Sequence, residues 1–419
     1  MRKRRLAVKS RRALLLALSM LPCAAQDASQ RFQTLYSFSG TPDGSDPDSV
    51  PALAIGTGGV VYGITALGGD YGSGTAYSLT PPALPGGAWT EAVLHSFGGP
   101  TDGALPYSGL AFGSDGFLYG TTEGGGAYGH GTVFSLAPPS VPGEAWTETV
   151  VYSFGERAHD GSQPYGTPVF GPHGVLYGTT TTGGPNVCSQ GSCGTVFALA
   201  PPAAPDGAWT EAILYTFGAP GDGYHPASSL LIGHDGSLYG NTVLGGAGSG
   251  GTVFRLTPPP SSGGEWAESI LLSFGSGGYP IGDLRVGVGP VLYGTTQSSV
   301  YSLTPPATAG GSWTYAALAA DLPLLFGGVA LDKRTGRLYG TTFYGGSENL
   351  GSIFMLAPPA SPGGAWTDTP IHSFTGSDGS YPVEGMLLSD GVLYGTTASD
   401  GVVCSGVGCG TVFSFVLAP

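Results

Sequence analysis

The sequence predicts an all-β protein: a seven-bladed β-propeller with four antiparallel strands in each blade. A phrase of the type Leu-Tyr-Gly-Thr-Thr, followed by a glycine-rich stretch and Gly-Thr-Val-Phe-Ser-Leu, recurs at intervals of 57, 58, 62, 54, 46 and 55 residues. Each copy also holds four short runs of apolar, aromatic and β-branched residues, separated by turn residues. A unit repeated at such a period is typical of a propeller or a solenoid. The tyrosines of the phrase are Tyr62, Tyr119, Tyr177, Tyr239, Tyr293, Tyr339 and Tyr394.

The second repeat shows how the strands of one blade are bounded. Its first strand, 110–113, ends at the turn Ser114-Asp115-Gly116, because Asp-Gly tolerates the positive φ of a tight hairpin. The second strand, 117–122, is followed by a glycine-rich loop and the third strand, 132–137. A proline-rich turn, which cannot continue a sheet, leads to the fourth strand, 146–154.

The two ends of the chain predict how the ring closes. Leu35-Tyr-Ser-Phe38 resembles a fourth strand, whereas the last strand, 410–415, resembles a third strand. We therefore expect residues 31–38 to pair with residues 410–417 and to complete the seventh blade, leaving no open edge. An open solenoid would instead leave a lone strand at one end. Residues 31–419 are predicted to form this single domain.

Other repeated features are interpreted as packing devices. Six tryptophans each begin a fourth strand, and we expect them to pack between neighbouring blades rather than to stack on a ligand. The glycine after each repeated tyrosine is expected to leave room for the backbone of the next blade. The fifth repeat loses the pattern, so an irregular edge or notch is expected between Val300 and Gly327. The tryptophans are Trp89, Trp146, Trp209, Trp266, Trp313 and Trp366.

Residues 1–25 are predicted to be an export signal. Seven of the chain's 14 basic residues lie in the first twelve positions, and an apolar run from Ala13 to Leu21 and small residues follow. Ser10-Arg11-Arg12 also fits a twin-arginine signal, and Cys23 leaves a lipoprotein open as an alternative. The expected location is outside the cell, in the periplasm or in the cell envelope.

The charge balance excludes some partners. Without the signal, seven basic residues face 28 acidic ones, a formal charge of about −21. That leaves too few cations for a nucleic-acid interface or for adhesion to anionic lipid. No later apolar stretch is long enough to span a membrane as a helix. We expect a monomer without cofactor or metal.

Four cysteines predict two local disulfides. Cys188 and Cys193 bracket four residues of the loop in the third repeat, and Cys404 and Cys409 do the same in the seventh. Export to an oxidising space favours disulfides. Zinc is the alternative, but it needs four ligands at one point, and these repeats lie nearly opposite each other across the ring.

Asp-Gly turns recur between a fourth strand and the next first strand. Together with nearby tyrosines, they form a candidate rim for Ca²⁺ or a carbohydrate. The alternative is structural: the aspartate accepts a hydrogen bond from its own turn, and the repetition favours this interpretation. The aspartates are Asp43, Asp102, Asp160, Asp222 and Asp378; the tyrosines are Tyr107, Tyr165, Tyr224 and Tyr381.

Enzyme signatures are few. No nucleophile elbow or phosphate-binding loop is present, and no histidine pair has the spacing of metal ligands. His159 beside Asp160, and His225 near Asp222, could act as acid and base on the rim. We assign no catalytic residue.

Two segments, Asp115 to Gly126 and Gly131 to Leu136, resemble the GloVer tandem repeat of exported bacterial proteins. Ile64 departs from the pattern in the first copy, and the fifth lacks the Gly-Gly loop. The resemblance implies an exported β-propeller with no assigned activity and supplies no catalytic residues. Members often carry a C-terminal anchor; the ending Val416 to Pro419 lacks one, so we expect release.

The expected function is therefore non-catalytic binding of a protein or carbohydrate by an exported propeller. The alternative is a propeller enzyme, a lyase or hydrolase of a polysaccharide or lactone, that uses rim carboxylates and histidines.

Overall fold

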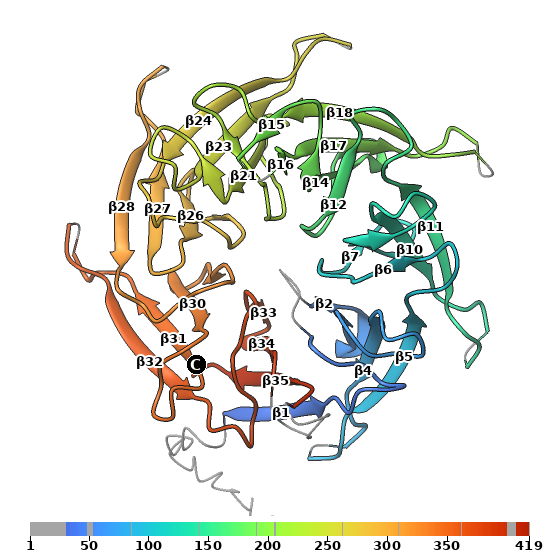
Figure 1. Cartoon of the computed structure of the whole chain (residues 1–419). Helices are drawn as coiled ribbons and strands as arrows, with labels where there is room; N and C mark the ends of the chain where they lie inside the picture. Colours follow the sequence, from blue (N-terminus) through green and yellow to red (C-terminus); the bar gives the residue numbers. More distant parts are fainter. Residues whose placement is uncertain are drawn as a thin grey trace, which may run out of the picture.

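Seven antiparallel sheets stand around a central axis in the computed structural model; six have four strands, and the third has a short fifth strand besides its four (Figure 1). The structure describes residues 31–47, 53–84, 86–141, 143–189, 191–204, 207–261, 263–308, 310–361, 363–399 and 408–418. This confirms the predicted seven-bladed propeller. The described residues contain strands and short 3₁₀ turns and no α-helix, and none of them belongs to a helix able to cross a membrane. The predicted signal, 1–25, lies outside the described residues.

Each blade runs from a short inner strand to a long outer strand. Blade 1 comprises β2 (Ala54–Ile55), β3 (Val61–Thr65), β4 (Thr75–Thr80) and β5 (Thr90–Ser96), and blade 2 comprises β7 (Ala111–Phe112), β8 (Leu118–Thr122), β10 (Thr132–Ala137) and β11 (Thr147–Ser153). Blade 3 comprises β13 (Val169–Phe170), β14 (Leu176–Gly183), β17 (Thr195–Ala200) and β18 (Thr210–Thr216). Blade 4 comprises β20 (Leu231–Ile232), β21 (Leu238–Thr242), β23 (Thr252–Thr257) and β24 (Ala267–Ser273). Blade 5 comprises β25 (Arg285–Val286), β26 (Leu292–Thr295), β27 (Val300–Thr304) and β28 (Thr314–Ala319). Blade 6 comprises β29 (Ala330–Asp332), β30 (Arg337–Thr342), β31 (Ser352–Ala357) and β32 (Thr367–Ser373). Blade 7 comprises β33 (Leu387–Ser389), β34 (Val392–Thr397), β35 (Thr411–Val416) and β1 (Phe32–Ser37).

The first strand of the chain closes the ring, as predicted. β1 pairs antiparallel with β35, with Phe32 opposite Phe415 and Ser37 opposite Thr411 (Figure 1). The Phe38 N–H donates to the Gly410 carbonyl, which extends the pairing by one step. Blade 7 therefore combines both ends of the described chain, and β1 gives it the fourth, outermost strand that the other blades also have.

In six of the seven interfaces, which we call seams and name by their blades, a phenylalanine that follows an outermost strand packs on an aromatic ring of the next blade's third strand. The buried Phe97 at the end of β5 packs edge-to-face on Phe134 of β10, with ring centroids 4.8 Å apart. The glycine of the repeat makes room for this ring: a Cβ on Gly120 would lie 2.5 Å from the Phe134 ring. The expectation that the glycine accommodates the next blade's backbone was wrong, because the ring it accommodates belongs to its own blade. The corresponding pairs are Phe38–Tyr77, Phe154–Phe197, Phe217–Phe254, Phe274–Tyr301 and Phe374–Phe413.

Side chains of the second strands also tie neighbouring blades together. The Thr341 hydroxyl donates to the Glu384 carbonyl at 2.9 Å, and the Thr396 hydroxyl donates to the Pro47 carbonyl at 2.9 Å. Asn241 donates its amide to the Gly282 carbonyl in the same way. These buried bonds explain the first threonine of Leu-Tyr-Gly-Thr-Thr in the later repeats; Ile64 of the first repeat cannot make one, and Thr121 Oγ1 of the second is buried without a partner among the described residues.

Seam 5–6 is the irregular one, within the predicted segment. Instead of a phenylalanine, the chain inserts Leu322 and Leu325, which are 9% and 1% exposed, into the core. Their N–H groups donate to the carbonyls of Ser298 and Gln297 in the shortened loop of blade 5. Leucines therefore fill this seam, and no notch opens at Leu322 and Leu325.

Candidate functional site

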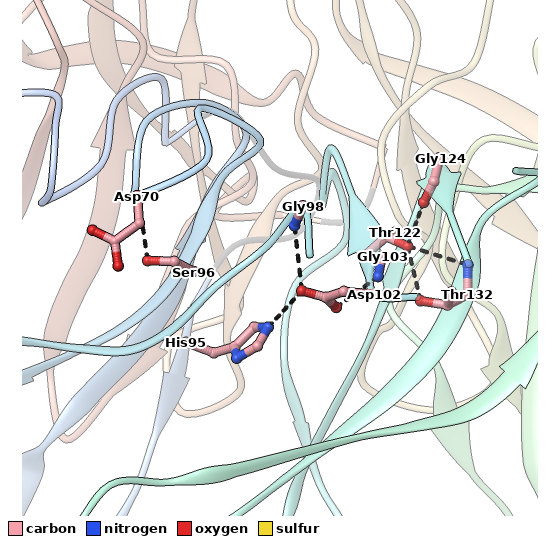
Figure 2. A network of polar contacts seen from close by, with 9 residues as sticks. All are labelled: Asp70, His95, Ser96, Gly98, Asp102, Gly103, Thr122, Gly124 and Thr132. Carbon is pink, nitrogen blue, oxygen red and sulfur yellow. Dashed lines mark hydrogen bonds and ion pairs between the residues drawn. The ribbon is translucent and has the colours of Figure 1, made fainter. Parts of the chain in front are cut away.

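The five predicted rim aspartates each lie in a connection between an outermost strand and the next blade. Asp102 is typical (Figure 2): one carboxylate oxygen accepts from the Gly103 N–H at 2.6 Å. The other accepts from the Gly98 N–H at 3.3 Å and from Nε2 of His95 at 2.8 Å. Both oxygens thus stabilise the turn and fasten it to the outermost strand of blade 1.

The same arrangement recurs at the other aspartates. Asp160 accepts from the Tyr152 hydroxyl at 3.0 Å, and Asp222 accepts from the Tyr215 hydroxyl at 3.0 Å. Asp43 pairs with Tyr36, and Asp378 pairs with His372. In blade 4, Leu272 replaces the tyrosine or histidine, and the following connection, 275–280, contains no aspartate. The aspartate is thus present where the strand offers a tyrosine or histidine and absent where it does not. This indicates that its role is to accept the hydrogen bond from that side chain.

The aspartates belong to five different seams, so the structure does not bring them together. The rim for Ca²⁺ or carbohydrate remains a prediction. At Asp102, Asp160, Asp222 and Asp378 a ligand would have to use oxygens that already accept hydrogen bonds, whereas Oδ1 of Asp43 is buried without a partner among the described residues.

Each of four aspartates has a glutamate of the next blade's outermost strand close by, a relationship that the sequence reasoning missed. One carboxylate oxygen of each glutamate is buried without a hydrogen-bond partner among the described residues. Burial, followed by the charge of the aspartate, raises the pKa of these glutamates to about 7. His95 opposes this rise for Glu148, and Arg157 opposes it for Glu211. We call these four groups the interblade carboxyl pairs. They are Asp43–Glu91, Asp102–Glu148, Asp160–Glu211 and Asp222–Glu268. The only sequence signal is a glutamate at the second position of four outermost strands.

His95, Asp102 and Glu148 are the group that most resembles a metal centre. One potential ligand atom from each lies within 4.8 Å of the others. A histidine and two carboxylates are suitable ligands for zinc or manganese. However, tyrosines 36, 152 and 215 take the place of His95 in the equivalent pairs. The repeated hydrogen bond therefore accounts for the arrangement.

An asymmetric polar pocket lies on the rim between blades 2 and 3. It has a volume of about 500 Å³ and is lined by two histidines, an arginine, an aspartate, hydroxyl side chains and glycine backbone. His130 Nδ1 lies 3.1 Å from the Ser162 hydroxyl. The Arg157 guanidinium, more than half exposed, reaches the buried Glu211 at 3.4 Å. The polar side chains are His130, Arg157, His159, Asp160, Ser162, Thr182 and Ser192.

Two unusual loops create this rim pocket. The connection after Phe154 is one residue longer than its counterpart after Phe97, and it supplies Arg157 and His159. In the facing loop Thr180 and Thr195 are 15 positions apart, compared with 10 positions between Thr122 and Thr132. β12 (Gly161–Pro164) pairs with the end of β14, which locks the two loops together.

The predicted disulfide between Cys188 and Cys193 is confirmed, with Cα atoms 5.4 Å apart. It staples the short hairpin of β15 (Val187–Cys188) and β16 (Gly191–Ser192), beside the rim pocket. Cys404 lies outside the described residues, so the pair Cys404–Cys409 remains a prediction; Cys409 itself is buried.

The two histidines singled out from the sequence have different surroundings. His159 lines the rim pocket, whereas His225 packs against Tyr224 with ring centroids 5.9 Å apart. Burial lowers the pKa of His225. His130 was not singled out, because its loop becomes part of the pocket only through the next blade.

The fold and this rim define a β-propeller built from tandem repeats. The chain belongs to the Gloeobacter/Verrucomicrobia repeat family, whose model matches residues 24–190 and 142–305. The resemblance drawn from the repeated phrase is thereby confirmed. A comparison with curated proteins gives no match.

Solved propellers share the fold at low sequence identity. Virginiamycin B lyase from Staphylococcus aureus is 13% identical with a TM-score of 0.52, and the alignment covers 92% of this chain and 100% of the lyase. An ulvan lyase of polysaccharide lyase family PL25, bound to -[GlcA(1-4)Rha3S]-, is 10% identical with a TM-score of 0.51 and coverages of 92% and 96%. PorZ, a surface component of the type-IX secretion system of Porphyromonas gingivalis, is 14% identical with a TM-score of 0.51, covering 91% of this chain and 47% of PorZ.

Proposed function

We propose that this protein is an exported, non-catalytic propeller that binds a carbohydrate in the rim pocket between blades 2 and 3. The observation that carries the proposal is the break in symmetry. The lengthened connection after Phe154 places Arg157 and His159 around one concave site, and the lengthened loop of blade 3 forms its other side, whereas the interblade carboxyl pairs repeat from seam to seam. A ligand site is expected where one blade differs from the others, because features repeated in every blade are explained by the packing that all blades share.

The chemistry of the rim pocket favours an oxygen-rich ligand. Arg157 and the histidines donate hydrogen bonds, while Asp160, the pocket's carboxylate, accepts from Tyr152, Gly155 and Gly161. A sugar offers hydroxyl oxygens to these donors, and a uronic acid also offers a carboxylate that a guanidinium can bind in bidentate fashion. The volume of about 500 Å³ lies within the roughly 300–1,000 Å³ usual for ligand sites.

Export is part of the proposal. The predicted signal in residues 1–25 and the Cys188–Cys193 disulfide support a location outside the cell or in the envelope. Edman sequencing of protein recovered from the medium or periplasm should begin at Gln26.

Calorimetric titration tests the binding function. We expect a 4-linked glucuronic acid tetrasaccharide to bind, and cellotetraose to bind more weakly because it lacks the carboxylate. Arg157→Gln should reduce the affinity for the acidic sugar at least tenfold. Arg255→Gln, in blade 4, is the matched control and should not. Equal affinities in the wild-type and Arg157→Gln proteins, at unchanged melting temperature, would contradict the proposal.

Catalysis at the same pocket is the second candidate. His130 beside Ser162 and His159 beside Asp160 could move protons, and Arg157 could neutralise a uronate carboxylate. The fold is shared with two lyases, which supports the candidate by analogy only. Formation of an unsaturated uronide, followed by ultraviolet absorbance and lost in His130→Gln or His159→Gln, would establish it. Binding without turnover would favour the scaffold.

A further inference from the structure

Five seams hold a tryptophan on a tyrosine, at the face of the ring opposite the rim pocket. The Trp146 indole packs edge-to-face on Tyr62 of the preceding blade, with ring centroids 5.9 Å apart. The other pairs lie at 6.1 to 6.4 Å, which confirms that these tryptophans pack between blades. They are Tyr119–Trp209, Tyr177–Trp266, Tyr239–Trp313 and Tyr293–Trp366. Trp89 packs in one cluster with Tyr394 at seam 7–1.

Seam 6–7 has the tyrosine and lacks the tryptophan. In five repeats the tryptophan precedes the seam phenylalanine by eight residues; before Phe38 that position is Gln30, which lies outside the described residues. A cavity of about 350 Å³ lies beside Tyr339, lined by Met355, Ile371 and Phe415. All six tryptophans of the chain are engaged at other seams. The cavity therefore presents the tyrosine on which an indole packs at the other seams, without an indole of the described chain against it.

Positive charge gathers at this cavity. Arg31 and Arg337 line it, and neither forms an ion pair among the described residues. Lys333 and Arg334 are exposed in the adjoining turn between β29 and β30, where Asp332 partly offsets Arg334 at 3.8 Å. Only seven basic residues follow the first twelve positions, so four of them meet at one seam of an acidic protein.

We propose that this cavity binds a small planar aromatic carboxylate of indole size. Its ring would occupy the place that tryptophan takes at the other seams, against Tyr339, Ile371 and Phe415. Its carboxylate would accept hydrogen bonds from Arg31 or Arg337. The site is independent of the rim pocket, which lies between other blades and at the other face.

Indole-3-propionate is the probe, titrated into the chain that begins at Gln26 and followed by saturation-transfer NMR and calorimetry. We expect it to bind at least tenfold more tightly than tryptamine, whose ammonium group the arginines disfavour. Arg337→Gln should remove most of that preference, whereas Arg255→Gln should not. Gln30→Trp supplies the missing indole and should weaken binding at least tenfold while it raises the melting temperature.

Three results would overturn the proposal. They are equal binding of the acid and the amine, no binding by the wild-type chain, and unchanged binding in both Arg337→Gln and Gln30→Trp. Tighter binding after deletion of residues 26–30 would show that the chain's own segment occupies the site, and would also overturn it.

Discussion

Phe32 stacks on His372 with ring centroids 3.9 Å apart and planes within 4° of each other. Phe32 belongs to the first strand of the chain, which is the outermost strand of blade 7, and His372 to the outermost strand of blade 6, so this contact ties the closing strand to the preceding blade. In β5 the position equivalent to Phe32 is Glu91, which lies opposite Leu79 as Phe32 lies opposite Phe415. At seam 6–7 an aromatic stack thus takes the place of an interblade carboxyl pair.

Removal of this stack should destabilise the ring. Phe32 also lies near Phe374 and Phe413, so Phe32→Ala should cost about 2–4 kcal/mol of unfolding free energy, measured by urea denaturation. Val416→Ala, at an exposed position on the neighbouring strand, should cost no more than about 0.5 kcal/mol. A chain that starts at Asp43 loses all of β1 and should be less stable still. Unchanged melting of that chain would contradict closure by the N-terminal strand.

The interblade carboxyl pairs predict that stability falls as pH rises from about 4.5 to 7. In the folded protein the pKa of Glu268 is raised to about 7 by burial and by Asp222, so it keeps its proton where the unfolded chain has lost it. Stability is complete below the unfolded pKa and declines until the folded group also ionises. Because Glu91, Glu148 and Glu268 are partly exposed, we expect on the order of 1 kcal/mol for each of these three.

The variant Glu268→Gln should reduce the difference in melting temperature between pH 5.5 and pH 8. Glu265→Gln, three residues away and exposed, is the control and should leave it unchanged. A wild-type protein that is more stable at pH 8 than at pH 5.5 would disprove a net stabilising protonation.

His95 should be replaceable by tyrosine but not by leucine. Tyr36, Tyr152 and Tyr215 make the same hydrogen bond to their aspartates, so His95→Tyr should change the unfolding free energy by less than about 1 kcal/mol. His95→Leu leaves a half-buried oxygen of Asp102 with one partner fewer and should cost about 1–3 kcal/mol. A zinc-dependent rise in melting temperature that His95→Tyr abolishes would instead reveal a metal centre.

The fold could be predicted from sequence because a blade repeats its own pattern. The order of strands at the chain ends also predicted the pairing of β1 with β35. What the sequence could not show are contacts between repeats. Glu148 lies in an outermost strand, and the sequence does not show that one of its carboxylate oxygens is buried close to Asp102 of the adjoining connection. Likewise, His130 of blade 2 and His159 of the following connection line one pocket in the folded ring, and the lengthened loop of blade 3 forms the other side of that pocket.

The two loop disulfides should each stabilise the protein slightly. The ring closed by Cys188 and Cys193 contains six residues, for which the chain-entropy estimate is roughly 2 kcal/mol. Peptide mapping without reduction should show Cys188 joined to Cys193 and Cys404 joined to Cys409. Cys188→Ser with Cys193→Ser should also weaken sugar binding, because the hairpin borders the rim pocket. A reactive thiol at Cys404 or Cys409 would refute the second pair.

The most direct test of the proposed function is a proton NMR titration of the seven histidine imidazoles with the glucuronic acid tetrasaccharide. Single histidine-to-glutamine variants assign the signals. The account predicts that the resonances of His130 and His159 shift together and saturate, while those of His173 and His234, exposed in turns between inner strands, do not move. Shifts at His173 or His234 with none at His130 and His159 would place the sugar elsewhere and contradict the rim pocket as the binding site.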